Sequence, residues 1–238
     1  WSCIQGHMGY AWADDIEKPT AAEIFLGDFF YFAGDHNAAG AEQLVGNIPE
    51  DYRTSWEPLL VPQNEDWASV IERVYAGRFT RLTRYAMKKA PTIFDPKKLQ
   101  SYIDALPKDY TIRQIDEELY HQAVREEFSK DFCSQFKDCD DFMKRGLGYM
   151  ILYNGKPVAG ASSYSVFTEG IEVEFVTKEE HRRKGLGIAA ASRLILECLD
   201  RELYPSWDAA NLQSRRIAEK LGYEFEREYL TYAIRDYR

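Results

Sequence analysis

One short run of the sequence combines three cationic side chains with two glycines. It reads Arg182-Arg183-Lys184-Gly185-Leu186-Gly187-Ile188, and apolar residues at helical spacing follow it. The N-terminus of a helix presents unpaired N–H groups and a partial positive charge, and a glycine lets an anion approach the backbone. Residues 182–188 therefore predict a binding site for a diphosphate. A solvated basic loop with a glycine hinge is the alternative interpretation, which the run alone leaves open.

Two carboxylates precede this run on a predicted strand. Glu172 and Glu174 are two residues apart, so their side chains share one face of a strand over residues 171–176. A carboxylate placed beside a reacting amine can take its proton. The same alternation of charged and apolar residues is also typical of a half-exposed strand without a catalytic role, and both interpretations stay open for each residue.

The glycines also fit a second kind of diphosphate ligand. Residues 185–190 match the Gly-x-Gly-x-x-Ala form of a dinucleotide fingerprint, which would indicate a nicotinamide-dependent oxidoreductase. That fold enters its glycines directly from a strand, whereas here a charged loop intervenes. It also needs a second buried strand ending in an acid, and residues 204–208 do not read as one. We therefore rank the oxidoreductase last among the functions considered for this chain.

The elements that must position these residues follow from the sequence pattern. The turn Asn154-Gly155 predicts a hairpin, and Gly222 predicts the end of a helix. In the C-terminal half we expect helices over 116–128, 140–144, after residue 187 and from 211, and strands over 149–153, 157–167, 171–176 and 229–234. In the N-terminal half we expect strands over 21–26, 29–32 and 78–85 and a helix over 38–45, with a connector over 88–98. The chain is thus predicted as two α/β parts, residues 1–106 and 107–238, the second with a mixed sheet flanked by helices.

Composition narrows the range of partners. The 238 residues carry a net charge of −9, which disfavours nucleic acid and anionic membranes and suits a cationic amine. The cysteines and histidines lack metal-ligand spacing, so we expect no metal site. The four cysteines do not suggest a disulfide framework, so a protein of the reducing cytoplasm is expected. No apolar run has the length of a membrane span. The oligomeric state is not predicted.

Two motifs in the C-terminal half of the chain resemble those of the GNAT acetyltransferases. The first is Arg182-x-x-Gly185-x-Gly187, similar to the family's Gln/Arg-x-x-Gly-x-Gly/Ala. The second begins at Asn211-x-x-Ser214 and continues through Glu219-Lys220-Leu221-Gly222-Tyr223. The resemblance runs from Tyr110 to the C-terminus and implies a mixed, mostly antiparallel GNAT-type sheet there. The sequence leaves open whether residues 1–106 are a second, degenerate copy of this fold. More narrowly, Pro205-x-Trp207-Asp208-Ala209 and the segment 27–34 look like the branch that contains the zwittermicin-resistance acetyltransferases.

The resemblance implies acetyl-CoA as cosubstrate and direct transfer of its acetyl group to a primary amine of a small molecule. N–H groups of residues 183–188 would hold the diphosphate. The strand over 171–177 would separate from its neighbour, so that the backbone could bind the pantetheine arm and the acetyl carbonyl. The residues expected to line that arm are Phe175, Val176, Thr177, Asn211 and Ser214, although Asn211 also fits a plain helix cap.

The sequence departs from the family at one position. Ala218 stands where relatives often have a tyrosine that acts as general acid, so no acid is assigned. Tyrosines 223, 229 and 232 lie nearby in sequence, but aromatic residues there more often belong to a core. A non-catalytic acyl-CoA-binding or sensor protein is therefore kept as an alternative function.

Overall fold

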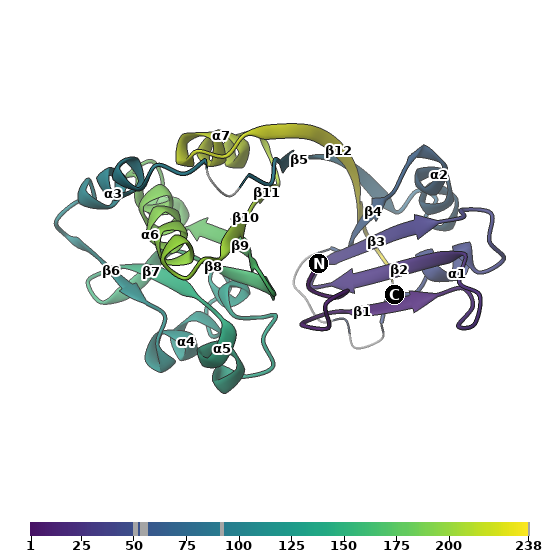
Figure 1. The fold of residues 1–238 in the computed structure, drawn as a ribbon, viewed down its shortest axis with the longest axis horizontal. Helices are drawn as coiled ribbons and strands as arrows, with labels where there is room; N and C mark the ends of the chain where they lie inside the picture. The colour runs from purple at the N-terminus through teal and green to yellow at the C-terminus, as the bar shows by residue number, and fades with distance from the viewer. Residues whose placement is uncertain (50–51, 53–56, 91–92, 238) are drawn as a thin grey trace. The chain divides into compact units, whose positions relative to one another are not determined.

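The computed structural model describes the chain except residues 50–51, 53–56, 91–92 and 238. It contains two compact units, drawn in Figure 1. Unit 1 comprises Trp1–Arg84 and Glu228–Arg238, and unit 2 comprises Tyr85–Arg227. Strands β5 (Phe79–Met87) and β12 (Phe225–Ile234) each carry the chain from one unit to the other. The predicted domain division between residues 106 and 107 stays a prediction.

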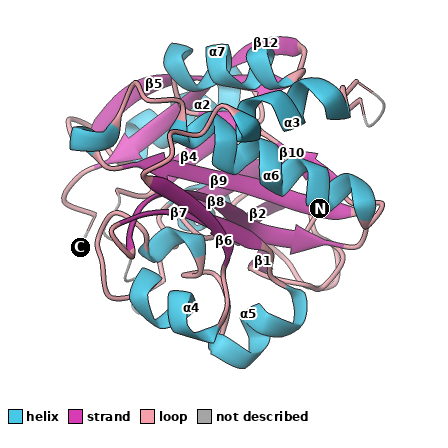
Figure 2. Ribbon diagram, turned by 90° about the vertical axis from the view of Figure 1, so that its left-hand side faces the viewer, coloured by secondary structure: helices cyan, strands magenta, loops and turns pink. Residues whose placement is uncertain are grey.

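Unit 2 is built around a five-stranded sheet in the order β10-β9-β8-β7-β6, in which only β10 runs parallel to its neighbour. Helix α6 lies on one face of this sheet and helices α4 and α5 on the other (Figure 2). The five strands are β6 (Tyr110–Gln114), β7 (Gly148–Tyr153), β8 (Lys156–Phe167), β9 (Gly170–Thr177) and β10 (Tyr204–Ser206). The short β11 (Asp208–Ala209) lies outside this sheet and pairs with β5. The helices are α3 (Pro96–Asp104), α4 (Glu117–Ala123), α5 (Cys139–Arg145), α6 (Leu186–Asp200) and α7 (Leu212–Leu221), with 3-10 turns η1 (Lys130–Phe132) and η2 (Glu179–His181).

Local signals explain several of these boundaries. Asn154 and Gly155 both have positive φ, 50° and 75°, and form the predicted turn between β7 and β8. Asn211 begins α7 by accepting a hydrogen bond from the Ser214 amide at 2.9 Å. Gly222 ends it in the left-handed conformation, as expected of a glycine after a helix. The hairpin and both ends of α7 are therefore confirmed.

Other sequence expectations were wrong. Residues 204–208 did not read as a buried strand, but residues 204–206 form strand β10, in which Pro205 and Ser206 are buried. Pro205 lacks an N–H and is tolerated because β10 lies at the edge of its sheet. The predicted connector over 88–98 contains the start of α3, where Asp95 caps the helix and Pro96 occupies its first turn. The helix expected to reach residue 128 ends at Ala123, and a 3-10 turn follows.

The second sheet has seven strands in the order β1-β2-β3-β4-β12-β5-β11. In unit 1, the two helices pack against a core that they share with this sheet. The further strands of unit 1 are β1 (Tyr10–Ala13), β2 (Ala21–Leu26), β3 (Phe29–Gly34) and β4 (Leu59–Pro62), and its helices are α1 (Ala41–Val45) and α2 (Glu65–Val74). The core centres on fully buried aromatic side chains such as Phe30, Trp67 and Tyr232. Since Tyr232 belongs to β12, this core requires the C-terminal strand as well as the N-terminal segment.

One carboxyl group lies inside this core. Glu23 of β2 is fully buried, and its Oε2 accepts a hydrogen bond from Nδ2 of Asn47 at 2.9 Å. Its Oε1 has no hydrogen-bond partner among the described residues. Burial raises the pKa of Glu23 to about 8, against 4.5 for an ordinary glutamate, because the charged form is poorly solvated there.

Glu23 should make folding depend on pH. Between about pH 4.5 and pH 8 the unfolded chain releases a proton that the folded chain retains, so the free energy of unfolding falls as pH rises. The slope attributable to this group is on the order of 1 kcal/mol per pH unit. We expect Glu23→Gln to flatten that dependence in urea unfolding at pH 5, 6.5 and 8. Glu226→Gln, at an exposed position of β12, is the control, and an unchanged slope in Glu23→Gln would contradict the assignment.

Candidate functional site

Strand β9 loses its parallel neighbour halfway along its length. Its pairing with β10 extends only from Gly170 to Glu172. The chain after β10 then forms β11, which pairs with β5 instead. Within the described residues, no strand pairs with this side of residues 173–177. The separation that the family resemblance implies is thus present, and it leaves backbone N–H and C=O groups that need other partners.

The basic loop connects the open end of β9 to α6. Arg182 Nε donates to the Thr177 carbonyl at 3.3 Å, which ties the loop back to the strand. Arg183 and Gly185 both have positive φ, 62° and 79°, so the chain turns sharply before the helix. Gly185 is the N-cap, and it provides no side chain to bind the first N–H groups of the 15-residue helix. That end of α6 can therefore accept an anion.

Gly187 packs closely against the end of β9. A Cβ at this position would lie 3.0 Å from Thr177 Oγ1 and about 3.5 Å from the Phe175 ring. The first turn of α6 thus lies directly against the end of β9. The diphosphate end and the strand edge of the candidate site are held together by this close approach.

A tyrosine on β6 holds two side chains of the loop region. Lys184 Nζ donates to the Tyr110 hydroxyl at 3.1 Å, and the same hydroxyl lies 3.0 Å from Nδ1 of His181. The ring of Tyr153 packs against both Tyr110 and His181, with centroids 5.1 Å and 5.3 Å away. Sequence reasoning missed Tyr110, because it lies more than 70 residues before its partners. This cluster fixes one cationic charge beside the loop.

The second family motif forms a support behind β9. Besides Asn211, which caps α7, Ser214 accepts a hydrogen bond from Nε1 of Trp207 at 3.3 Å. The Trp207 ring packs against Phe175 with centroids 4.7 Å apart. Ser214 is thereby linked through Trp207 to the open strand. That Asn211 and Ser214 also line a bound cofactor stays a prediction.

Glu172 and Glu174 lie, as expected, on one face of β9, and both are partly buried. Glu174 is opposite Ser162 of β8, whose hydroxyl donates to the Phe132 carbonyl, so the pair faces η1 rather than α6. Burial and, less strongly, the charge of Glu172 raise the pKa of Tyr204. Their catalytic role stays a prediction.

The position of a general acid is filled by an apolar side chain. Ala218 is fully buried on α7 and carries no proton to give. Tyr223 donates its hydroxyl proton to the Pro205 carbonyl at 2.6 Å, and burial raises its pKa well above the ordinary value. Tyr232 donates to Glu72 within unit 1. These contacts give Tyr223 and Tyr232 structural roles.

The described residues contain no group of three or more His, Cys, Asp or Glu side chains arranged to hold a metal ion. Across the same residues, no helix combines the length and hydropathy that a membrane span requires.

Comparisons with known proteins agree on one family. A family model described as GNAT acetyltransferase matches residues 1–232. A GCN5-related N-acetyltransferase-like protein from Streptococcus suis is 41% identical, with a TM-score of 0.91 over 99% of this chain and 92% of that one. No curated protein matches.

More distant structures share the fold alone. A GCN5-related N-acetyltransferase from Kribbella flavida is 17% identical, with a TM-score of 0.54 over 90% of this chain and 86% of that one. A tandem GNAT protein from the clavulanic acid biosynthesis pathway is 14% identical, with a TM-score of 0.56 over 92% of this chain and 79% of that one.

The contact of Gly187 with β9 generates a prediction about binding. Gly187→Val should remove the rise in Tm caused by acetyl-CoA, because the added methyl groups push the start of α6 away from Thr177 and Phe175. Differential scanning fluorimetry with circular dichroism would measure binding and fold together. Gly155→Ala is the control, because Gly155 also needs a positive φ but lies in the turn between β7 and β8. This variant should have a lower Tm and keep the rise in Tm caused by acetyl-CoA. A normal rise in Gly187→Val would show that ligand binds elsewhere.

Proposed function

The chain belongs to the GNAT acetyltransferase family, and we propose that it transfers the acetyl group of acetyl-CoA to a primary amine of a small molecule. Within the family, the motif around Trp207 and the segment 27–34 favour the zwittermicin-resistance branch. Net charge and cysteine usage favour a cytoplasmic protein without a nucleic-acid partner.

The observation that carries this proposal is the open edge of β9 beside the uncapped end of α6. Acetyl-CoA has a diphosphate joined to a long amide-containing arm that ends in a thioester. The N–H groups and cationic side chains of residues 182–188 suit the diphosphate. Residues 173–176 offer roughly 13 Å of backbone edge, at about 3.3 Å per residue, on which the amides of the arm can pair. A dinucleotide has no such arm.

The proposed reaction is a direct transfer. A neutral amine attacks the thioester carbonyl, the C–N bond forms, and the C–S bond of the tetrahedral intermediate then breaks to release CoA. The amine must lose a proton, and Glu172 or Glu174 is proposed to accept it. The leaving thiolate must gain one, and we propose water as its donor because Ala218 and Tyr223 supply none.

The absence of a tyrosine hydroxyl at Ala218 also favours a second candidate. A protein that binds acetyl-CoA without transferring the acetyl group would retain the open strand and the loop and would need no acid. Release of free CoA in the presence of a panel of primary amines distinguishes the two functions. Turnover with any amine supports the enzyme, whereas tight binding without turnover supports the sensor.

Ligand choice gives the first test of the proposal. Acetyl-CoA at 100 times its Kd should stabilise the folded chain by about 2.7 kcal/mol, because it binds only the folded state. NAD should leave Tm unchanged, since it lacks the arm that pairs with β9. Thermal unfolding of the wild-type chain with each ligand measures this. Equal shifts with both ligands, or a shift with NAD alone, would contradict the cofactor assignment.

The carboxylates give the second test. Glu172→Gln and Glu174→Gln, singly and together, should lower kcat, by on the order of 10²- to 10⁴-fold in at least one variant. The loss should shrink at high pH, where the amine is already neutral and needs no base. Steady-state rates with one good amine substrate across pH 6.5–9.5 would show this. Glu169→Gln, in the turn before β9, is the matched control, and near-normal rates at neutral pH in the double variant would refute the assignment.

A further inference from the structure

Part of the order of elements in unit 2 is repeated in unit 1. In unit 2, the antiparallel pair β8–β9 leads to α6, then to β10 parallel to β9, and, after the short β11, to α7. In unit 1, the antiparallel pair β2–β3 leads to α1, then to β4 parallel to β3, and then to α2. This shared succession of three strands and two helices, with the same strand directions, indicates two copies of one fold within the chain.

The second helix of each copy begins in the same way. Both α2 and α7 have ten residues and an asparagine N-cap, Asn64 and Asn211. Each asparagine accepts a hydrogen bond from the amide three residues later, at Trp67 in α2 and at Ser214 in α7. Trp67 therefore occupies in unit 1 the position that Ser214 occupies in unit 2.

The diphosphate loop has no equivalent in unit 1. The chain between β3 and α1 reads Asp35-His36-Asn37-Ala38-Ala39-Gly40, without lysine or arginine. Helix α1 has five residues, against 15 in α6. Asp66, at the start of α2, lies 3.9 Å from Nδ1 of His36. An acidic loop before a short helix disfavours a phosphate where unit 2 favours one.

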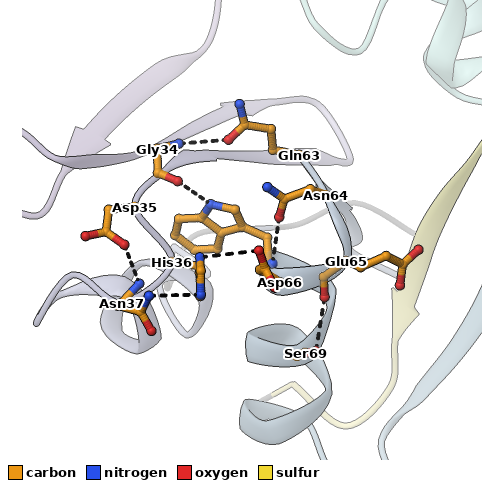
Figure 3. A network of polar contacts seen from close by, with 10 residues as sticks. Gly34, Asp35, His36, Asn37, Gln63, Asn64, Glu65, Asp66 and Ser69 are labelled. Atoms are coloured by element: carbon orange, nitrogen blue, oxygen red, sulfur yellow. Dashed lines mark hydrogen bonds and ion pairs between the residues drawn. The ribbon is translucent and has the colours of Figure 1, made fainter.

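The strands of unit 1 do not separate, and side chains fill the place where they would. Parallel pairing of β3 with β4 continues to Phe32, two residues before the end of β3. Beyond that point the Gly34 amide donates to Oε1 of Gln63 at 3.0 Å, and Nε1 of Trp67 donates to the Gly34 carbonyl at 3.0 Å (Figure 3). Trp67 is fully buried and stacks on Phe32 with centroids 5.7 Å apart. The backbone groups of Gly34 that a pantetheine arm would need are thus already bonded.

We propose that unit 1 is a second copy of the acyltransferase fold whose cofactor slot is sealed by Gln63 and Trp67, so that each chain binds one acetyl-CoA, on unit 2. This inference rests on the proposed function for its ligand. The open and the sealed slot differ at corresponding places: Trp207 and Ser214 support an open strand edge in unit 2, whereas Trp67 closes it in unit 1.

The stoichiometry of binding tests the proposal on the full chain. Isothermal titration with acetyl-CoA should give one equivalent per chain in the wild type and none in Gly187→Val. Two equivalents in the wild type, or one equivalent remaining in a Gly187→Val variant that retains its circular dichroism spectrum, would overturn the seal.

The two tryptophans provide a readout that does not depend on a folded variant. In the chain labelled with 5-fluorotryptophan, acetyl-CoA should shift the 19F resonance of Trp207 and leave that of Trp67 unchanged, with assignments from Trp67→Phe and Trp207→Phe. A ligand-induced shift at Trp67 would overturn the proposal.

The seal can also be tested without ligand. The Trp67 indole proton should exchange with solvent roughly 100-fold more slowly than that of Trp1, which is 68% exposed. Rapid exchange of the Trp67 indole proton would by itself contradict the proposal that the slot of unit 1 is closed. If acetyl-CoA does not bind at all and the exchange is slow, the proposed function is contradicted, whereas the closed slot of unit 1 is supported.

Discussion

The candidate site depends on a hydrogen-bond ladder that stops after three residues. Trp207 stands where β10 ends and β11 begins, and its ring is buried against Phe175 of β9 and against Tyr223. This packing anchors the point at which the chain leaves β9 and turns from β10 into β11. Burial of a large aromatic surface stabilises the divergence, which otherwise leaves strand N–H and C=O groups without strand partners. The opening is therefore built into the core of unit 2 and does not require a ligand to form.

Charge is distributed against the overall balance of the chain. A protein with net charge −9 concentrates three cationic residues in one loop and holds one of them, Lys184, on the hydroxyl of Tyr110. The loop thus carries the sign that an anionic diphosphate requires, with an effect over distances of about 10 Å at ordinary salt.

The sequence predicted those parts of the site that depend on neighbouring residues. The Asn154-Gly155 turn, the cap at Asn211 and the stop at Gly222 are determined by backbone preferences within a few residues. It did not predict features set by distant packing. Strand β10 exists because Gly170–Glu172 pair with it despite Pro205, and Tyr110 reaches the loop only after the sheet has formed. The sequence left open whether residues 1–106 are a second copy of the fold. It did not predict the hydrogen bond of Trp67 to Gly34, since a buried tryptophan at a helix start has no distinctive pattern.

The return of β12 to unit 1 has a consequence for how the chain acquires its structure during synthesis. Tyr232 bonds to Glu72, 160 residues earlier, and pairs with Leu60 in the sheet. A ribosome releases the N-terminal segment first, yet the sheet of unit 1 lacks an internal strand until residues 228–234 emerge. Contacts of such long sequence separation form slowly, because the closure of a long loop precedes any gain from the contact. The five-stranded sheet of unit 2 is complete once Ser206 has been synthesised. It can therefore assemble on the nascent chain before the N-terminal segment, which is synthesised first, has β12 to complete the sheet of unit 1.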